Sequence, residues 1–336
     1  MALTVRFFRV LFALQDLLSQ ATGKGDRAGR PQRPDPDAVG GVLGPHDGYA
    51  EMDDGARLFY RAYLPDRPQE VLACFHGMGA YGGHFRVIGE YLQPRGTAVY
   101  LFDLRGHGLS EGPRADLSRM DRVIADLDGL KYFLELRHPR IPVHFLGESL
   151  AASLVLKAAA ESPRGLAGII LSAAELRPLV RPKAVEVLRY LPYLLVDSRS
   201  NSIEMGERER LVSRDPEHFP RAQRDPLRSE RFSVRTIVEV HALIQEWPSL
   251  ARRLSVPCLI LQGGGDLLTD PQAAYELLGS IASPDKELAF FPKAYHGLFY
   301  DPDTPQVLEA LARWLERSKH GTAKRERPDQ YYNSRL

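Results

Sequence analysis

The sequence has little cysteine and lacks long apolar runs. Only two of its 336 residues are cysteines, Cys74 and Cys258, and each lies within an apolar stretch. We expect both to be buried core residues, with no disulfide framework and no thiolate metal site. No stretch of 18 or more apolar residues occurs, which excludes a single helical membrane span. A reducing compartment agrees with this cysteine usage, so we expect a cytoplasmic protein.

The sequence also lacks a strong charge of either sign. Lys plus Arg is 44 and Asp plus Glu is 43, which gives a formal net charge of +1. The broad positive field of a nucleic-acid binder is therefore missing, and no nucleic-acid partner is expected. There is no glycine-rich phosphate loop, no HExxH motif and no metal-ligand spacing of Cys and His. We therefore predict neither a cofactor nor a metal.

Both ends of the chain differ in composition from its middle. Residues 1–18 form an amphipathic pattern, with Arg6, Arg9 and Asp16 on one narrow helical face. We predict a helix that makes peripheral membrane contact, with packing on the protein body or a processed signal as alternatives. Residues 19–41 are rich in Gly, Pro, Arg and Asp and are predicted to be a flexible linker. Residues 318–336 are predicted to be a disordered tail.

Short β-rich runs alternate with amphipathic helical segments through the middle of the chain. This rhythm predicts an α/β fold, with a mostly parallel sheet and helices on both faces, over 42–174 and 255–317. Residues 175–254 carry no clear strand, and we predict a helical cap over the C-terminal edge of the sheet. The predicted strands are 58–63, 71–75, 98–102, 143–146, 168–171, 258–262 and 288–291. The predicted helices are 83–93, 117–136, 150–160, 271–278 and 304–317.

One serine follows a predicted strand in a recognisable pattern. Residues 147–151 read Gly-Glu-Ser-Leu-Ala, between a short apolar strand and an Ala-rich helix. In this context a G-x-S-x-G elbow exposes a strained nucleophilic serine above a sheet. We interpret Ser149 as the nucleophile, with a serine that merely caps the following helix as the alternative. Ala151 replaces the last glycine of the motif and adds one methyl group at a tight position.

A nucleophilic serine needs a base and an orienting acid further along the chain. Among ten histidines, His296 is the one that follows the serine outside the predicted cap and tail. It lies just after the last predicted strand, and elimination makes it the predicted base. Asp266 follows the preceding predicted strand and three glycines, and it is the predicted acid. Asp270 and Glu175 are the alternatives for that role.

The tetrahedral intermediate of acyl transfer also needs two backbone N–H donors for its oxyanion. Leu150, directly after the serine, is predicted to supply one. The sequence His-Gly-Met-Gly at 76–79 follows the predicted strand 71–75, and the Met78 amide is predicted to supply the other. The alternative is an ordinary glycine-rich turn between a strand and a helix.

Several motifs together resemble one family, the monoacylglycerol lipase and lysophospholipase branch of the α/β-hydrolases, which are serine aminopeptidase-like hydrolases. The resemblance spans about 270 residues, from 49 to 317, and implies the α/β-hydrolase fold with a cap. It also implies that 103–110 is a supporting loop near the oxyanion turn, with no catalytic role. At the elbow the chain departs from the family, with Glu148 and Leu150 where members often carry His and Met. The matching motifs are HGMG at 76–79 with Phe85, DLRGHGLSEG at 103–112, LQGGGD at 261–266 and KAYH at 293–296.

The same resemblance implies an activity. It is that of a serine esterase that cleaves carboxylic esters of fatty acids through an acyl-enzyme on Ser149, as a monoacylglycerol lipase or lysophospholipase. The substrate would be a single-chain acyl lipid in a greasy channel shaped by the cap. Two alternatives stay open: a hydrolase-fold protein that binds an apolar ligand with little turnover, and an esterase or thioesterase that acts on a non-lipid ester.

Overall fold

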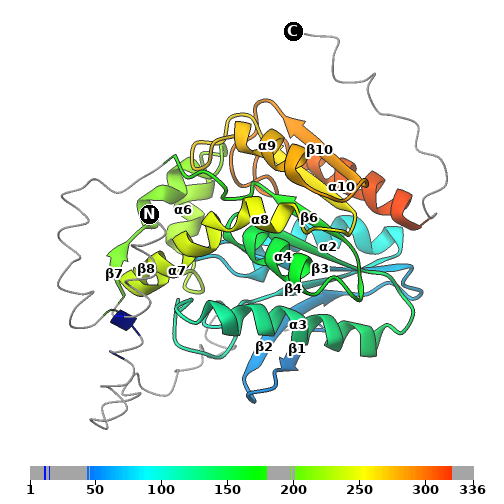
Figure 1. Cartoon of the computed structure of the whole chain (residues 1–336), viewed down its shortest axis with the longest axis horizontal. Helices are drawn as coiled ribbons and strands as arrows, with labels where there is room; N and C mark the ends of the chain where they lie inside the picture. Colours follow the sequence, from blue (N-terminus) through cyan, green and yellow to red (C-terminus); the bar gives the residue numbers. More distant parts are fainter. Residues whose placement is uncertain are drawn as a thin grey trace.

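A single large sheet forms the centre of the computed structural model (Figure 1), which describes residues 46–179 and 201–319 together with positions 11, 12, 15, 44 and 198. Its strand order is β1-β2-β4-β3-β5-β6-β9-β10. β2 is antiparallel to β1 and β4, and the other neighbours are parallel. The predicted, mostly parallel sheet is thus confirmed. The strands are β1 (Gly48–Glu51), β2 (Arg57–Tyr63), β3 (Glu70–Phe75), β4 (Thr97–Phe102), β5 (Val143–Glu148), β6 (Leu166–Ser172), β9 (Cys258–Gly263) and β10 (Lys286–Phe291).

Helices cover both faces of this sheet. Alternate side chains of a strand point to opposite faces, and in β3 Ala73 joins one hydrophobic cluster while Cys74 joins the other. α3 (Met120–Arg137), α4 (Leu150–Glu161) and α9 (Gln272–Ser280) contribute to the first cluster. α2 (Arg86–Leu92) and α10 (Thr304–Lys319) contribute to the second. Cys74 and Cys258 are both buried and free, as expected.

The predicted elements of the core agree closely with the structure. All seven predicted strands are present, and each predicted boundary lies within two residues of the observed one. The predicted helix 83–93 is a succession of η2 (Gly82–Phe85), α2 and η3 (Gln93–Arg95). The sequence analysis missed β1, because this edge strand has only four residues and only one of them is buried. So short a strand leaves no clear apolar alternation.

The segment between β6 and β9 is partly helical, as predicted for a cap. It contains η4 (Gly206–Leu211), α6 (His218–Gln223), α7 (Val234–Gln245) and α8 (Trp247–Ala251). We call this segment the cap. It also contains two short strands that the sequence analysis did not identify, since β7 (Asn201–Glu204) and β8 (Arg231–Ser233) pair as an antiparallel two-stranded sheet. These strands have three or four residues and are largely polar. They therefore show no hydrophobic periodicity in the sequence.

Part of the N-terminal segment packs on this region. The ring of Phe12 is 1% exposed and contacts Val234 of α7. The guanidinium of Arg235 lies 4.9 Å from the centre of the same ring, which is a favourable cation–π distance. Gln15 Oε1 accepts a hydrogen bond from Ser198 Oγ at 2.6 Å. Phe12 and Gln15 of the N-terminal segment therefore contact other residues of the same chain.

The other predictions for the chain ends cannot be compared with the structure. The predicted linker 19–41, most of the predicted helix 1–18 and nearly all of the predicted tail 318–336 lie outside the described residues. Within the described part, no helix combines the length and the apolar character that a membrane crossing requires.

Candidate active site

Ser149 lies at the sharp turn between β5 and α4. Its φ of 57° and ψ of −120° put a non-glycine residue in a strained backbone conformation, as an exposed nucleophile at an elbow requires. Gly147 is essential to this turn, because a Cβ there would lie 2.3 Å from the carbonyl oxygen of Ala151. Ala151 itself is fully buried in the core on α4. The structure therefore has the strand–turn–helix geometry that the sequence predicted, with the additional methyl group of Ala151 accommodated.

His296 and Asp266 come together at the C-terminal ends of β10 and β9. His296 Nδ1 donates to Asp266 Oδ2 at 2.8 Å, and both side chains are buried. Asp266 Oδ1 accepts the backbone N–H groups of Leu268 and Thr269 at 2.8 and 3.0 Å. The carboxylate is thus fixed by its own loop. Because the hydrogen bond places the proton on Nδ1, Nε2 of His296 is left as the nitrogen that can accept a proton.

The two alternative acids are placed differently. Asp270 accepts the N–H of Gln272 at 3.0 Å and forms an ion pair with Arg177 at 2.8 Å. Glu175 lines the same pocket as His296. The hydrogen bond from the His296 imidazole goes to Asp266, so the structure favours Asp266 as the orienting acid.

Ser149 and His296 line one pocket, whose free volume is about 100 Å³. Gly77 and Met78 line it too, and a Cβ on Gly77 would lie 3.1 Å from the Cβ of Ser149. The predicted oxyanion loop therefore packs directly against the elbow, where Leu150 is the first residue of α4. Among the described residues, no group of His, Cys, Asp and Glu side chains could bind a metal ion.

His76 fixes the backbone of the oxyanion loop. Its Nε2 accepts the N–H of Leu104 at 3.0 Å, so Nδ1 carries the proton and donates to the carbonyl oxygen of Gly77 at 2.8 Å. Burial lowers the pKa of His76 well below its usual value, which keeps the imidazole neutral. His76 thereby connects the loop that presents the Met78 amide to the segment that follows β4.

The segment 103–112 is built around a buried aspartate. Asp103 accepts the N–H groups of Gly82 and Leu109, each at 2.7 Å. Ser110 Oγ donates to the Asp103 carbonyl oxygen at 2.6 Å and accepts the N–H of Phe59 at 2.8 Å. These contacts make the segment a brace between β2, β4 and the start of η2, beside the oxyanion loop.

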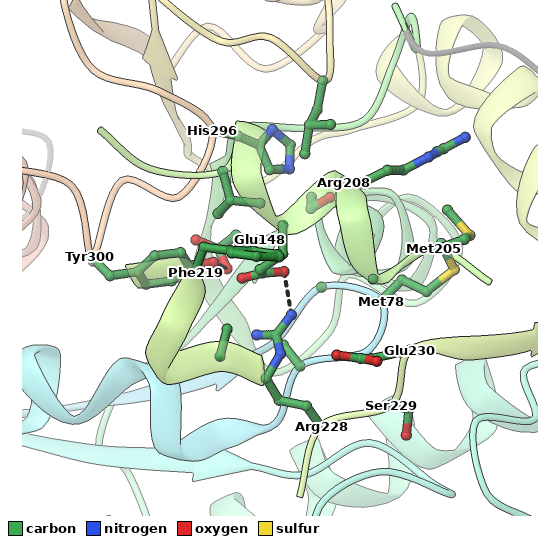
Figure 2. A pocket seen from close by; sticks show the side chains of 18 of the residues that line it. Met78, Glu148, Met205, Arg208, Phe219, Arg228, Ser229, Glu230, His296 and Tyr300 are labelled. Atoms are coloured by element: carbon green, nitrogen blue, oxygen red, sulfur yellow. Dashed lines mark hydrogen bonds and ion pairs between the residues drawn. The ribbon is translucent and has the colours of Figure 1, made fainter. Parts of the chain in front are cut away.

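The cap side of the pocket is more polar than the greasy channel expected from the sequence. Figure 2 shows Arg228 reaching toward a carboxylate there. Arg228 pairs with Glu209 and donates to His84 Nε2 at 3.0 Å, and His218 Nε2 lies 2.6 Å from Glu209 Oε1. Apolar side chains such as Phe219 also line this wall. The pocket is therefore bounded by a paired charge network as well as by hydrocarbon.

The sequence analysis assigned no role to two residues near the elbow. Glu148, directly before the nucleophile, is 1% exposed and lines the pocket. The hydroxyl of Tyr300 donates to Glu148 Oε2 at 3.0 Å. Tyr300 lies four residues after His296 in the sequence. The signal in the sequence was an acidic residue next to the predicted nucleophile, but its burial could not be derived from that pattern.

The electrostatic balance around His296 favours its charged form. Burial opposes the charge, but Asp266, and then Glu148 and Glu175, outweigh that effect and raise the pKa of the imidazole. For Glu148, burial is the largest cause and raises the pKa to about 7, against the lowering effect of His296 and of the Tyr300 hydroxyl. The imidazolium that forms when a serine gives up its proton would thus be stabilised here.

Known proteins resemble this chain over most of its length. A family model described as "Serine aminopeptidase, S33" matches residues 66–303. Monoglyceride lipase of Rattus norvegicus is 30% identical over 273 residues, which cover 78% of this chain and 88% of the relative. Monoacylglycerol lipase of Mycolicibacterium smegmatis is 28% identical over 265 residues, covering 78% of this chain and 93% of the relative.

A solved structure supports the same relationship. The monoacylglycerol lipase of Paleococcus ferrophilus superposes with a TM-score of 0.67 at 25% identity, over 78% of this chain and 99% of that one. The α/β-hydrolase fold expected from the sequence motifs is thereby confirmed. The family model matches from just before β3 to just before α10, including the segment between β6 and β9, so it covers every residue that lines the pocket.

Proposed function

The chain belongs to the serine aminopeptidase S33 family of the α/β-hydrolases, and on that premise we propose that it hydrolyses carboxylic esters of single-chain acyl lipids. The activity is that of a monoacylglycerol lipase or lysophospholipase. The observation that carries the proposal is the 2.8 Å hydrogen bond between His296 and Asp266, in a pocket that Ser149 lines from a strained elbow.

The proposed mechanism assigns one role to each group. Ser149 Oγ attacks the ester carbonyl carbon while His296 Nε2 takes its proton, and Asp266 fixes the imidazole and stabilises its charge. The amides of Met78 and Leu150 donate to the oxyanion. His296 then protonates the departing alcohol and an acyl-enzyme remains. Water, deprotonated by His296, attacks the acyl carbon, and the fatty acid leaves as Ser149 regains its proton.

The pocket limits how much of a substrate can lie beside the reacting groups. Its volume of about 100 Å³ is below the 300 Å³ or so at which ordinary small-molecule pockets begin. Only the ester group and the first carbons of an acyl chain fit in this space, against the wall that includes Met78 and Phe219. We also propose that residues 1–18 contact a membrane peripherally, on its cytoplasmic side, because amphipathic segments of this composition bind lipid interfaces.

A fluorophosphonate probe tests the proposal directly, since it reacts with activated serines. We expect the wild-type protein to be labelled and Ser149→Ala not to be. On a short p-nitrophenyl ester, Ser149→Ala should lose more than about 99.9% of turnover, because the members of a triad act as a unit. An unlabelled wild-type protein would instead support a ligand binder with little turnover.

A substrate panel then tests the lipid assignment. Monoglycerides and lysophospholipids should be turned over with higher kcat/KM than short alkyl esters, aromatic esters or acyl thioesters. A maximum for a non-lipid ester or a thioester would contradict the assignment while leaving the serine mechanism intact.

A further inference from the structure

A buried carboxyl group adjoins the nucleophile and has an unpaired oxygen. Glu148 is the last residue of β5 and is 1% exposed. Its Oε2 accepts the Tyr300 hydroxyl at 3.0 Å. Its Oε1 is also buried, and no group of the described chain forms a hydrogen bond with it. Buried carboxyl groups in this state are costly, so their presence beside a reactive centre calls for a functional explanation.

Several titratable groups face Glu148, and most of them carry no variable charge near neutral pH. The Cys74 thiol of β3 is buried, and burial raises its pKa well above the usual value. Glu209 of η4 is an ion-pair partner of Arg228, from the segment before β8, so these two opposite charges largely cancel at Glu148. Tyr300 also has a pKa well above its usual value because of burial. The remaining group is His296, on the loop after β10.

We propose that Glu148, fixed by the Tyr300 hydroxyl, is a positioning residue that acts on His296 as a second carboxylate beside Asp266, and that it sets the acid limit of the enzyme's activity. This inference rests on the proposed function, in which His296 is the base. Asp266 fixes the orientation of the imidazole through Nδ1. Glu148 and His296 are both buried and line the same pocket, where charges are poorly screened. No hydrogen bond joins the two side chains in the described structure, so Glu148 acts on His296 through its charge.

The direction of the effect follows from the charges. An ionised Glu148 favours the imidazolium and so raises the pKa of His296. The base works in its neutral form, so a raised pKa moves the acid limb of the kcat/KM profile to higher pH. A neutral side chain at position 148 should therefore lower the pKa of His296 and move the acid limb to lower pH. Since the pKa of Glu148 is itself raised to about 7, the two groups titrate as a coupled pair.

Tyr300 provides an independent way to change the same charge. Its hydrogen bond lowers the pKa of Glu148, so Tyr300→Phe should keep Glu148 neutral over a wider range of pH. The acid limb should then move in the same direction as in Glu148→Gln, but by less. Tyr300→Phe added to Glu148→Gln should cause no further movement, because the charge through which Tyr300 acts is already gone. The phenyl ring preserves the stacking on His218 at 4.8 Å between ring centres.

The experiment measures two quantities in the wild type, Glu148→Gln, Tyr300→Phe and the double variant. One is the pH profile of kcat/KM on a short ester, and the other is the titration of the His296 imidazole followed by NMR. In Glu148→Gln we expect both midpoints to fall by about 0.5 to 1 pH unit. Glu230→Gln is the matched control, since this carboxylate lines the same pocket but is exposed, and its acid limb should stay where it is in the wild type.

The outcomes separate this inference from the proposed function. An unchanged His296 titration in a folded Glu148→Gln overturns the inference, even if activity falls. A further shift from Tyr300→Phe in the Glu148→Gln background also overturns it. If Glu148→Gln does not fold, Tyr300→Phe alone decides by the same two readouts. If the wild type shows no esterase activity, the proposed function fails, while the NMR titration still tests whether Glu148 acts on His296.

Discussion

The two sides of the pocket are built in different ways. On the core side, backbone geometry fixes two of the groups: Ser149 by the elbow and Asp266 by two N–H donors of its own loop. On the cap side, charged side chains pair with one another, as Arg228 does with Glu209. Backbone-fixed groups keep their positions when a single side chain changes, whereas an ion pair depends on both partners. We therefore expect side-chain changes in the cap to alter substrate binding, measured as KM, more than they alter the rate of the chemical step, measured as kcat.

The cap nevertheless contacts both loops that serve the chemistry. The N–H of Ser229 donates to the carbonyl oxygen of Gly79 at 2.9 Å, at the end of the proposed oxyanion loop, 76–79. The N–H of Gly297, adjacent to the proposed base His296, donates to the carbonyl oxygen of Val212 at 2.8 Å. A Cβ on Gly79 would lie 2.4 Å from the Ser229 carbonyl oxygen, so this contact is close. Changes in the cap can thus reach the active site, through these backbone contacts and through the ion pair of Arg214 with Asp301 on the loop after β10.

The largest effect of a single change on the core side is expected for Asp266→Asn. The amide can still accept the N–H groups of Leu268 and Thr269, but it cannot accept from His296 Nδ1 if its NH₂ group faces the ring. The imidazole would then carry its proton on the wrong nitrogen. We expect kcat to fall by about 10⁴-fold, as the same change does in other Ser-His-Asp enzymes, with KM within about threefold.

Asp270→Asn is the matched control for that experiment. Asp270 lies four residues further along and pairs with Arg177 instead of the imidazole. Its kcat should stay within about twofold of the wild type. A loss in Asp270→Asn as large as that in Asp266→Asn would mean that the acid had been misassigned.

The core side was also the part that the sequence could predict. A glycine at 147 and a serine at 149, directly after a buried strand, predict an elbow, because few other residues fit so tight a turn. Chain order then selected His296 and Asp266. The information is local, and each residue is tied to the end of one strand, where parallel sheets bring such groups together.

The cap side could not be predicted to the same depth. β7 and β8 are short, polar and paired with each other, so neither leaves a periodic pattern. The partners Glu209 and Arg228 are separated by 19 residues in the sequence, and nothing in their spacing identifies them as a pair. The hydrogen-bond partner of Glu148 is likewise distant in the sequence, since Tyr300 lies 152 residues further along.

The next largest effect should come from His76→Phe, which removes a support of the oxyanion loop and no reacting group. The phenyl ring leaves the Gly77 carbonyl oxygen and the Leu104 N–H without their partner. The Met78 amide should then be less well placed for the oxyanion. Since losing one such donor costs about 10²- to 10³-fold in rate, we expect a smaller loss in kcat, of about 10- to 100-fold.

His107→Phe serves as the control for His76→Phe. It also removes a buried imidazole, whose ring centre lies 5.2 Å from that of His76, but one that bonds to Arg105 and not to Gly77. Its kcat should change by less than about threefold, provided that a thermal denaturation curve shows the variant to be folded. Equal losses in both variants would assign the effect to general loosening of the loops.

Arg228→Leu should have the smallest effect on kcat. It tests the distinction between the core side and the cap side most sharply, because Arg228 lines the same pocket as Ser149 and His296. Its side chain is 9% exposed, and its removal leaves Glu209 with His218 as partner. We expect KM for a monoglyceride to rise by about three- to tenfold, as a rearranged wall binds the lipid less well. The kcat on a short ester should stay within about threefold, and Arg231→Leu, at an exposed pair of the same region, should change neither. Arg228→Leu could instead reduce kcat on the short ester as much as His76→Phe does. The ion pairs of the cap would then position the reacting groups, and the distinction between a catalytic core side and a substrate-binding cap side would be wrong.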